Sequence, residues 1–390
     1  MKLLYLHRTQ AKGVEGVHIG EIVKGMRALG HSVAIVSPVG ERFGDAAEDG
    51  AGARGWSMRL YKFVTRYVPE LIFELLELAY NISAVRQARK RVDGASLDAI
   101  FERYAIFGLA GAHLARRWRK PLYLEVNYTS RSPLVRRRSR LLRPLAERLD
   151  RRIFSAASAL FAVSSTLKDE LVRRYGIPAQ RVHVLPNAAD PDVFDPARVV
   201  PADIPGPAGR RFIGFVGGFY PWHGLSLLLE AFVRIAPRFP DAALLLIGDG
   251  PMRGAIEARA AESGLAERVL FQGRVPHALL PRYVARFHVG VMPDSNDYGS
   301  PMKIFEYMAM AKPVVVPDYP PLRDVVTDGE QGLIFRPGDA QALAGCLERM
   351  LRDEADYRRM AQRARAHVLE KHNWRANAEF ILRTIEGDKK

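Results

Sequence analysis

Short apolar runs alternate with amphipathic stretches along almost the whole chain. The runs have the length and composition of buried strands, and the stretches between them repeat their apolar residues at helical spacing. Alternating strands and helices predict parallel sheets with crossover helices, so we expect an α/β fold. The expected strands are 2–7, 32–37, 99–103, 121–127, 159–163, 181–185, 212–217, 243–247, 269–272, 289–292, 313–316 and 332–335. The expected helices include 17–29, 107–117, 166–175 and 302–311.

A proline-rich stretch interrupts this rhythm near the middle of the chain. Residues 186–210 contain six prolines and little periodicity, which is typical of a connection between domains. We therefore predict two doubly wound, Rossmann-like domains facing a cleft, over 1–190 and 211–373, joined by a linker over 191–210. A helical tail over 374–388 is expected to pack back on the first domain.

The chain is strongly basic. Its 390 residues include 58 Lys and Arg against 43 Asp and Glu, which gives a formal net charge of +15. Such a balance attracts polyanions, whether nucleic acid, anionic lipid or phosphorylated substrates. Much of the excess lies in residues 131–152, where leucines recur at roughly helical spacing among arginines. This segment is either a basic amphipathic helix that lies on an anionic membrane or a solvated helix with arginines on its outer face.

Other features of the composition bear on the compartment. No run of about 18 apolar residues is present, so no transmembrane helix is expected. The apolar start of the chain is too short for a signal peptide and is interpreted as the first buried strand. The single cysteine, Cys346, fits a reducing compartment. We expect a cytoplasmic protein, with peripheral binding at the inner membrane face as an alternative. Residues 41–58, rich in Gly, Ala and charge, are expected to form a loop.

The strongest local signal for chemistry follows the fourth expected strand of the second half. Ser300 and Pro301 stand in the favoured order for a helix N-cap and first helical position. The amino end of the helix, with Lys303 in its first turn, suits a phosphate group. Glu306 lies one turn deeper on the same face, where its carboxylate can accept hydrogen bonds from a ribose diol. The alternative is a surface Glu306 paired with Lys303 and nothing bound.

A glycine-rich stretch follows the first expected strand. Gly13 and Gly16 would let the backbone approach a diphosphate closely, with the amino end of helix 17–29 behind them. A simple strand-to-helix turn is the alternative.

Several stretches together resemble glycosyltransferase family 4, retaining enzymes of GT-B fold. Each stretch is weak alone, but they occur in the family's order and span essentially the whole chain. The longest, SPMKIFEYMAMAKPVVV at 300–316, resembles the family's donor-site segment. The others are GVEGVHIG at 13–20 with LGH at 29–31, ERY at 102–104, EVN at 125–127, FVGGFYPWHG at 215–224 and LIGDGP at 246–251.

The resemblance implies a sugar transfer from a nucleoside-diphosphate sugar, with UDP or GDP as the expected nucleotide. The acceptor would be a glycan, a lipid-linked molecule or a small molecule, held by the first domain, and configuration would be retained. Neither cofactor nor metal is expected, because helix dipoles and basic side chains neutralise the leaving diphosphate in such enzymes. The candidate donor-binding residues are Gly16, Gly218, His223, Gly248, Arg274, Ser300, Pro301, Met302, Lys303 and Glu306. The candidate catalytic residues are Glu125, Asn127 and His223.

The donor-site segment departs from the family's pattern at one glutamate. The family usually has two glutamates at a fixed spacing, of which the second corresponds to Glu306. Tyr298 stands where the first would fall. That glutamate contacts the transferred sugar in relatives, so Asp294, Asn296 or Asp297 would have to replace it.

A second departure concerns the diphosphate. The family commonly places an arginine and a lysine where this chain has Gly218 and His223. A protonated His223 could still donate to a phosphate, with Arg274 and Lys303 supplying further charge. The alternative is a loop histidine stacked near Trp222.

A third departure is Asn127, which stands near a strand end where many relatives have histidine. Asn127 cannot act as an acid or a base, but it can donate a hydrogen bond to a sugar hydroxyl. Glu125 is the nearest carboxylate, and strand alternation places it on the same face as Asn127. A buried pair with Arg103 or Arg131 is the alternative role for Glu125.

Other functions compete with sugar transfer. A non-catalytic protein that binds sugar nucleotides or polyanions would explain the altered donor segment, and a sugar-nucleotide epimerase could use the same fold. The arginine run suggests a nucleic-acid binder, but no aromatic residue for base stacking lies between Arg131 and Arg152, so no nucleic-acid partner is expected. The chain has no phosphate-loop signature, zinc-ligand pattern or Gly-x-Ser-x-Gly elbow.

Overall fold

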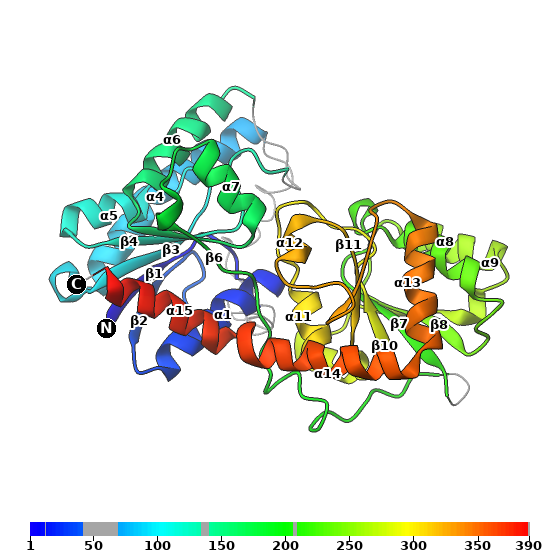
Figure 1. The fold of residues 1–390 in the computed structure, drawn as a ribbon. Coiled ribbons are helices and arrows are strands. Elements are labelled where there is room, and N and C mark those ends of the chain that lie inside the picture. Colours follow the sequence, from blue (N-terminus) through cyan, green and yellow to red (C-terminus); the bar gives the residue numbers. More distant parts are fainter. Residues whose placement is uncertain (12, 42–68, 134–139, 206–208, 389–390) are drawn as a thin grey trace. The chain divides into compact units, whose positions relative to one another are not determined.

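The chain folds into two compact units, each built on one parallel sheet (Figure 1). The computed structural model describes residues 1–11, 13–41, 69–133, 140–205 and 209–388. The first unit consists of Met1–Leu185 with Asn377–Lys390, and the second of Pro186–Ala376.

The sheet of the first unit has six strands in the order β2-β1-β3-β4-β5-β6. The strands are β1 (Lys2–Leu6), β2 (Ser32–Val36), β3 (Ala99–Arg103), β4 (Leu122–Val126), β5 (Ala159–Ala162) and β6 (Val182–Val184). The helices and 3₁₀ turns are α1 (Gly13–Ala28), α4 (Glu70–Arg91), η1 (Gly94–Ser96), α5 (Ala110–Trp118), α6 (Arg143–Ala156), α7 (Ser165–Arg173), η2 (Ala179–Arg181) and most of α15 (Trp374–Gly387). Figure 1 shows α4, α5, α6 and α7 on one face of this sheet and α1 with α15 on the other.

Buried aromatic rings hold the tail on the first unit. Phe161 of β5 is fully buried, and its ring centroid lies 6.1 Å from that of Phe380 in α15. The Tyr123 hydroxyl donates to Asp388 at 3.0 Å. Because these contacts join β4 and β5 to α15, the carboxyl-terminal segment belongs to the core of the unit where the chain begins.

The sheet of the second unit also has six parallel strands, in the order β12-β11-β10-β7-β8-β9. The strands are β7 (Arg211–Val216), β8 (Ala242–Ile247), β9 (Val269–Gly273), β10 (Phe287–Val291), β11 (Val314–Pro317) and β12 (Gly332–Phe335). The helices and turns are η3 (Pro221–His223), α8 (Leu225–Ile235), α9 (Arg253–Glu262), η4 (Ala266–Arg268), η5 (His277–Leu279), α10 (Leu280–Val284), α11 (Met302–Ala309), α12 (Pro320–Arg323), α13 (Ala340–Arg352) and α14 (Glu354–Lys371). One apolar core packs against α8 and α13, and a second packs against α11 and α14.

The predicted α/β class with two parallel, doubly wound sheets is confirmed. Every expected strand is present, with ends shifted by no more than two residues. All four expected helices are present with different limits, and α5 begins at Ala110 rather than at residue 107. Helix α1 begins at Gly13 rather than residue 17, and α11 ends at Ala309 rather than residue 311 because Ala311 adopts a left-handed conformation with φ of 54°.

The expected linker over 191–210 differs from the structure. Phe194, Ala202 and Ile204 are buried in the core that packs on α11, and Asp195 pairs with Arg365 of α14 at 2.9 Å. The boundary falls after Leu185. The prolines mark irregular backbone, but the apolar residues between them anchor it to the second unit. The expected loop 41–58 lies, apart from residue 41, outside the described residues.

Candidate functional site

The carboxyl ends of the strands in the second sheet carry most of the candidate donor residues. In a parallel sheet these ends lie at one edge, which is where open α/β sheets bind ligands. Gly218 and His223 follow β7, Gly248 follows β8, and Arg274 follows β9. The segment between β10 and α11 completes this edge.

The start of α11 is not built as its sequence predicts. Pro301, not Ser300, is the N-cap residue, and no side chain caps the helix. The Ser300 hydroxyl instead accepts from the Asn187 backbone N–H at 2.9 Å, and the Ser300 carbonyl accepts from the Asn187 side chain at 2.5 Å. The predicted serine cap is therefore wrong, because a contact with a distant segment takes the hydroxyl. The first turn, which includes buried Met302, keeps an amino end without a side-chain acceptor.

Lys303 points from the first turn of α11 toward the loop after β7. Its Nζ lies 4.4 Å from the centre of the Phe215 ring, and a β-carbon placed on Gly217 would stand 2.7 Å from it. Burial lowers the pKa of Lys303 to about 8, although the Glu306 carboxylate opposes this shift. A half-buried ammonium therefore stands beside a glycine that leaves it room.

Glu306 has a partner that the sequence did not reveal. It is only 4% exposed, and its Oε1 accepts from Nε2 of His277 at 2.7 Å. His277 opens the turn η5, three residues after Arg274, and packs near Phe194. Glu306 is thus not on the surface, and its side-chain hydrogen bond is to His277. The only available signal was the position of His277 shortly after a strand end.

His223 is neutral at physiological pH in this structure. Its Nδ1 donates to the Gly218 carbonyl, which fixes the ring and leaves Nε2 as the unprotonated nitrogen. Burial, followed by the charge of Lys303, lowers the pKa of His223 to about 4. A protonated His223, which the sequence left open as a phosphate donor, is therefore disfavoured by its surroundings. The stacked pair in this loop is Tyr220 with Trp222, at 4.6 Å between ring centres, while His223 meets Trp222 edge-on.

The segment after β10 holds one carboxylate firmly. Asp294 accepts from the Tyr319 hydroxyl at 3.0 Å, and its Cβ lies 2.7 Å from where a β-carbon on Gly224 would stand. Asn296 accepts from the backbone N–H groups of the loop itself, and Asp297 is exposed. Of the residues considered as replacements for the missing glutamate, Asp294 is the one that contacts the loop containing His223.

A backbone contact joins the loops after β7 and β8. A β-carbon on Gly248 would stand 1.9 Å from the Gly217 carbonyl oxygen, so only glycine fits there. Gly248 also has φ of 133°, and its N–H donates to the Gly273 carbonyl at 2.7 Å. Arg274 is exposed directly after this contact.

In the first unit, Glu125 is the centre of a buried polar cluster. It pairs with Arg103, accepts from His18 at 3.0 Å and accepts from the Asn127 side chain at 2.5 Å. Tyr5 donates to its other oxygen at 3.3 Å. Burial favours protonation, but the charges of Arg103 and then His18 outweigh it and hold the pKa of Glu125 below its ordinary range.

These contacts decide between the alternatives left open for Glu125. Its buried cationic partner is Arg103, while Arg131 pairs with Glu147 at 2.7 Å. Asn127 lies on the same face as Glu125 and is oriented by it. An ionised carboxylate with these partners does not supply a proton at neutral pH.

Gly16 lies inside α1 rather than in a loop. Because the helix begins at Gly13, which has φ of 53°, Gly16 is in its first turn and is buried. The same helix brings His18 to Glu125.

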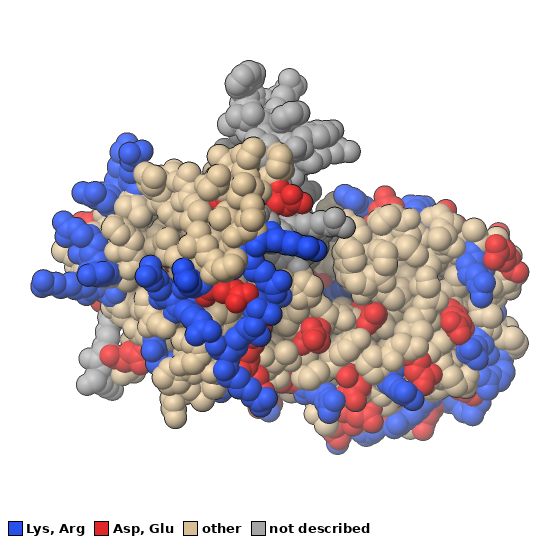
Figure 2. Space-filling view, turned by 90° about the horizontal axis from the view of Figure 1, so that it is seen from above, with Lys and Arg blue, Asp and Glu red and all other residues tan. Residues whose placement is uncertain are grey.

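The described part of the basic segment is helix α6, whose apolar side packs into the core of the first unit. Its buried residues include Ala146, Leu149, Ile153 and Phe154. Its exposed cations are Arg143, Arg148, Arg151 and Arg152. Figure 2 shows Lys and Arg side chains gathered over the first unit. The arginines thus face solvent, residues 134–139 lie outside the described residues, and membrane contact by this helix stays a prediction.

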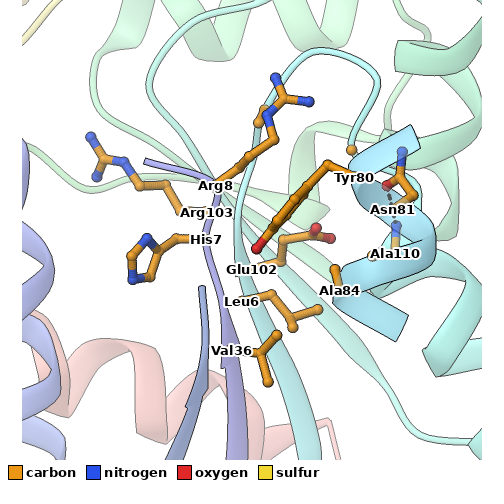
Figure 3. A pocket seen from close by; sticks show the side chains of 12 residues that line it. Leu6, His7, Arg8, Val36, Tyr80, Asn81, Ala84, Glu102, Arg103 and Ala110 are labelled. Atoms are coloured by element: carbon orange, nitrogen blue, oxygen red, sulfur yellow. Dashed lines mark hydrogen bonds between the residues drawn. The ribbon is translucent and has the colours of Figure 1, made fainter. Parts of the chain in front are cut away.

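A small cavity lies between β1, β3 and α4 in the first unit (Figure 3). Its volume is about 20 Å³, which is room for about one water molecule. Glu102, Arg8 and Tyr80 line it, and burial raises the pKa of Glu102 to about 8. Arg8 is held by Glu77 at 2.8 Å.

The described residues contain neither a metal-binding group of side chains nor a membrane-spanning helix. No three His, Cys, Asp or Glu side chains there form a group that could hold a metal ion. None of the helices described is both long and apolar enough to cross a membrane.

Comparisons with known proteins match both units. The model for Glycosyltransferase Family 4 matches residues 13–193, and the model for Glycosyl transferases group 1 matches residues 201–367. The chain is 28% identical over 230 residues to the alpha-D-kanosaminyltransferase of Streptomyces kanamyceticus, covering 58% of this chain and 59% of that relative. It is 27% identical over 324 residues to the D-inositol 3-phosphate glycosyltransferase of Nocardia farcinica, covering 79% and 70%.

Solved structures with the same fold cover nearly the whole chain. A glycosyltransferase from Rickettsia africae has a TM-score of 0.73 at 16% identity and covers 100% of this chain and 98% of its own. HepE from Anabaena, solved in complex with UDP, has a TM-score of 0.72 at 18% identity and covers 99% and 100%. At such identities the likeness shows the fold alone.

Proposed function

The chain belongs to the family 4 glycosyltransferases of GT-B fold, and we propose that it moves a sugar from a nucleoside diphosphate to an acceptor hydroxyl with retention of configuration. The bond between the anomeric carbon and the diphosphate oxygen would break as a bond to the acceptor oxygen forms on the same face of the sugar. The acceptor proton would pass to the leaving diphosphate, so no nucleophilic side chain is required. Membership of the family supports this proposal.

The main support for a donor site in the second unit is the arrangement of Lys303 and Glu306 on one short helix. Lys303 and the uncapped amino end of α11 present positive charge at the carboxyl edge of the second sheet. Glu306, oriented by His277, presents a buried carboxylate one turn deeper. We assign the diphosphate to the first and a ribose diol to the second. Positive groups that are already in place stabilise the negative charge that develops on the leaving diphosphate, and this stabilisation is an effective form of catalysis.

The expected role of His223 changes with its surroundings. Because Nδ1 donates to Gly218, the free nitrogen is Nε2, which accepts a hydrogen bond rather than donating one. We propose that neutral His223 accepts from a hydroxyl of the donor sugar and that Asp294 contacts the same sugar. Gly218, Gly248 and Arg274 would surround the diphosphate.

The first unit would hold the acceptor. We propose that Asn127 donates to a hydroxyl near the reacting carbon and that Glu125 is a positioning residue that orients Asn127 and His18. The contact between Gly16 and the distal phosphate remains part of this proposal. Relatives named for a kanosaminyl transfer and for D-inositol 3-phosphate support a polar acceptor, with glycans and lipid-linked molecules as further candidates.

The donor is proposed to carry UDP or GDP and to need no metal. The complex of HepE with UDP supports UDP as the first nucleotide to test. Transfer without a resident metal ion is supported by the positive groups available to neutralise the diphosphate, which are Lys303, Arg274 and the amino end of α11. Equal turnover with and without EDTA is the expected result, and loss of turnover that magnesium restores would contradict it.

The test begins with a thermal-shift panel of UDP-, GDP-, ADP- and TDP-sugars on the purified chain. A ligand at a hundred times its dissociation constant stabilises the folded state by about 2.7 kcal/mol. The donor that binds is then followed by NMR with Glu306→Ala and, as a matched control, Glu257→Ala on the exposed helix α9. Wild-type turnover by Glu306→Ala would overturn the donor assignment. A new nucleotide sugar formed without acceptor would indicate an epimerase, and binding without consumption a non-catalytic protein.

A further inference from the structure

Helix α4 exposes large apolar side chains, although its inward side already packs Leu78, Tyr80, Ala84, Val85 and Ala88 into the core of the first unit. Large apolar side chains stand in solvent along its first four turns, with exposed fractions of 36% for Leu71, 49% for Ile72, 50% for Leu75, 48% for Leu76 and 57% for Ile82. Two of its three acidic residues turn inward, and the third, Glu70 at the first position of the helix, is exposed. Glu74 is 2% exposed, and Glu77 pairs with Arg8 of the same unit. A surface helix normally buries its apolar stripe and exposes its charges.

The same outward side of α4 becomes cationic toward its carboxyl end. Arg86, Arg89 and Lys90 are exposed. At about 100° per residue they project to the same side as Ile72, Leu75 and Ile82. Glu74 and Glu77, by that geometry, project to the opposite side. The side of α4 that carries Ile72, Leu75 and Ile82 therefore combines apolar side chains and cations, while the exposed Glu70 projects to the side of Glu74 and Glu77.

The surrounding surface has the same character. Figure 1 shows α6 on the same face of the first sheet as α4. The exposed arginines of α6 are accompanied by exposed Leu141 and Leu145. Two elements far apart in the sequence thus present leucines and cations on the same face of the first sheet.

We infer that the exposed face of α4 docks on an anionic lipid membrane. The apolar residues would enter the boundary between headgroups and acyl chains, and Arg86, Arg89 and Lys90 would contact lipid phosphates. Burial of apolar area and attraction to anionic lipid are the two terms that hold interfacial helices on membranes. The inference does not rest on the donor chemistry, because none of these residues lies in the second unit.

Charge complementarity favours a membrane over a second copy of the chain. A twofold pair would place this face against itself, because such interfaces use the same patch on both subunits. Among the described residues of α4, this side offers no carboxylate, so the cations would lose water without gaining a counterion. An anionic bilayer supplies both an apolar layer and phosphate groups.

The test is co-flotation of the full chain with vesicles of phosphatidylcholine, alone and with phosphatidylglycerol added. We expect flotation only with phosphatidylglycerol, and less of it as salt is raised. Arg86→Gln with Arg89→Gln and Lys90→Gln should weaken partitioning about fivefold per cation, since each contributes about 1 kcal/mol near an anionic surface. Ile72→Ser with Leu75→Ser and Leu76→Ser should abolish flotation.

Matched controls lie in the second unit. Leu279→Ser with Leu369→Ser changes leucines that are 44% and 45% exposed, and Arg352→Gln with Arg358→Gln and Arg363→Gln removes the same charge. Both controls should float like the wild type, and thermal melts check that every variant folds. An environment-sensitive dye on Ile72→Cys, in a Cys346→Ser background, should shift to the blue on anionic vesicles.

Several results would overturn the inference. The inference is wrong if the wild-type protein does not float on anionic vesicles. It is also wrong if the α4 variants float as well as the wild type. Loss of binding confined to Arg148→Gln with Arg151→Gln and Arg152→Gln would assign the membrane to α6 alone. A dimer in solution that both α4 variants dissociate, without vesicle binding, would assign the face to a second copy.

Discussion

The Nε2 atom of His277 lies 2.7 Å from the Oε1 atom of Glu306, so a residue near the end of β9 orients the carboxylate of α11. Glu306 is almost fully buried, and a buried carboxylate is costly unless it is hydrogen-bonded. His277 therefore both satisfies Glu306 and fixes the direction in which its remaining lone pairs point.

This contact predicts that His277→Ala weakens donor binding without touching the diphosphate. The donor Kd should rise about tenfold. One hydrogen bond to a charged group is worth about 1.5–3 kcal/mol, and a water molecule replaces part of it in the variant. Isothermal titration with the donor measures it. His113→Ala, at an exposed position, is the control. In the double variant of His277→Ala with Glu306→Ala, a loss of binding free energy equal to the sum of the two single losses would show that the two residues act independently.

The ionisation of Lys303 is expected to set the alkaline limb of the kcat/KM profile against pH. Its pKa of about 8 means that the ammonium is present below this pH and is lost as the pH rises through it. If the ammonium binds the diphosphate, kcat/KM should fall by up to tenfold per pH unit above about 8. Lys303→Met should be weaker throughout and should lack this limb. A wild-type profile that stays flat across this region would contradict the role.

Substitution of Glu125 is expected to lower the free energy of unfolding strongly. Glu125→Gln leaves the Arg103 guanidinium buried without its counter-charge, and breaking a buried pair costs about 3–5 kcal/mol. Urea unfolding followed by circular dichroism measures the loss. Glu147→Gln breaks the partly exposed pair with Arg131 and should cost no more than about 1 kcal/mol.

A second variant tests the same explanation if Glu125→Gln does not fold. Replacing both partners, as Glu125→Leu with Arg103→Met, removes the uncompensated charge and should recover part of the stability. Equal losses for Glu125→Gln and Glu147→Gln would show that the buried cluster is not a special source of stability.

Gly248 and Gly254 form a matched pair for the donor loops. Gly248→Ala places a methyl group 1.9 Å from the Gly217 carbonyl, so the loops after β7 and β8 must separate. We expect a loss of about 1–3 kcal/mol in stability and weaker donor binding. Gly254→Ala meets nothing within 4 Å on helix α9 and should be neutral or slightly stabilising. Equal donor affinity in both variants would contradict the importance of the close approach.

The order of the elements could be read from the sequence because it depends on local pattern. Buried parallel strands are continuous apolar runs, and the runs that form β1 and β8 are bounded by polar or turn residues. Lys303 and Glu306 could be placed on one face of a helix for the same reason. Element ends were less certain, as the early start of α1 at Gly13 shows.

The partners of the site residues could not be read in this way. Ser300 has the residue type of an N-cap, yet its hydroxyl serves Asn187, which is 113 positions away. His18 had no assigned role until α1 brought it to Glu125. His277 carried no motif at all. Such pairings depend on which loops the sheet order brings together, and spacing along the chain does not encode that order.

By itself, the sequence determined the fold class, the sequence of strands and helices, and the short helix that carries Lys303 and Glu306, because each follows from local periodicity. Only the tertiary structure decided that Glu306 bonds to His277, that Ser300 is taken by Asn187, that His223 is neutral, and that α4 exposes its leucines. These features arise from burial and from contacts between distant segments. Burial sets the cost of a charge, and distant contacts decide which partner offsets it.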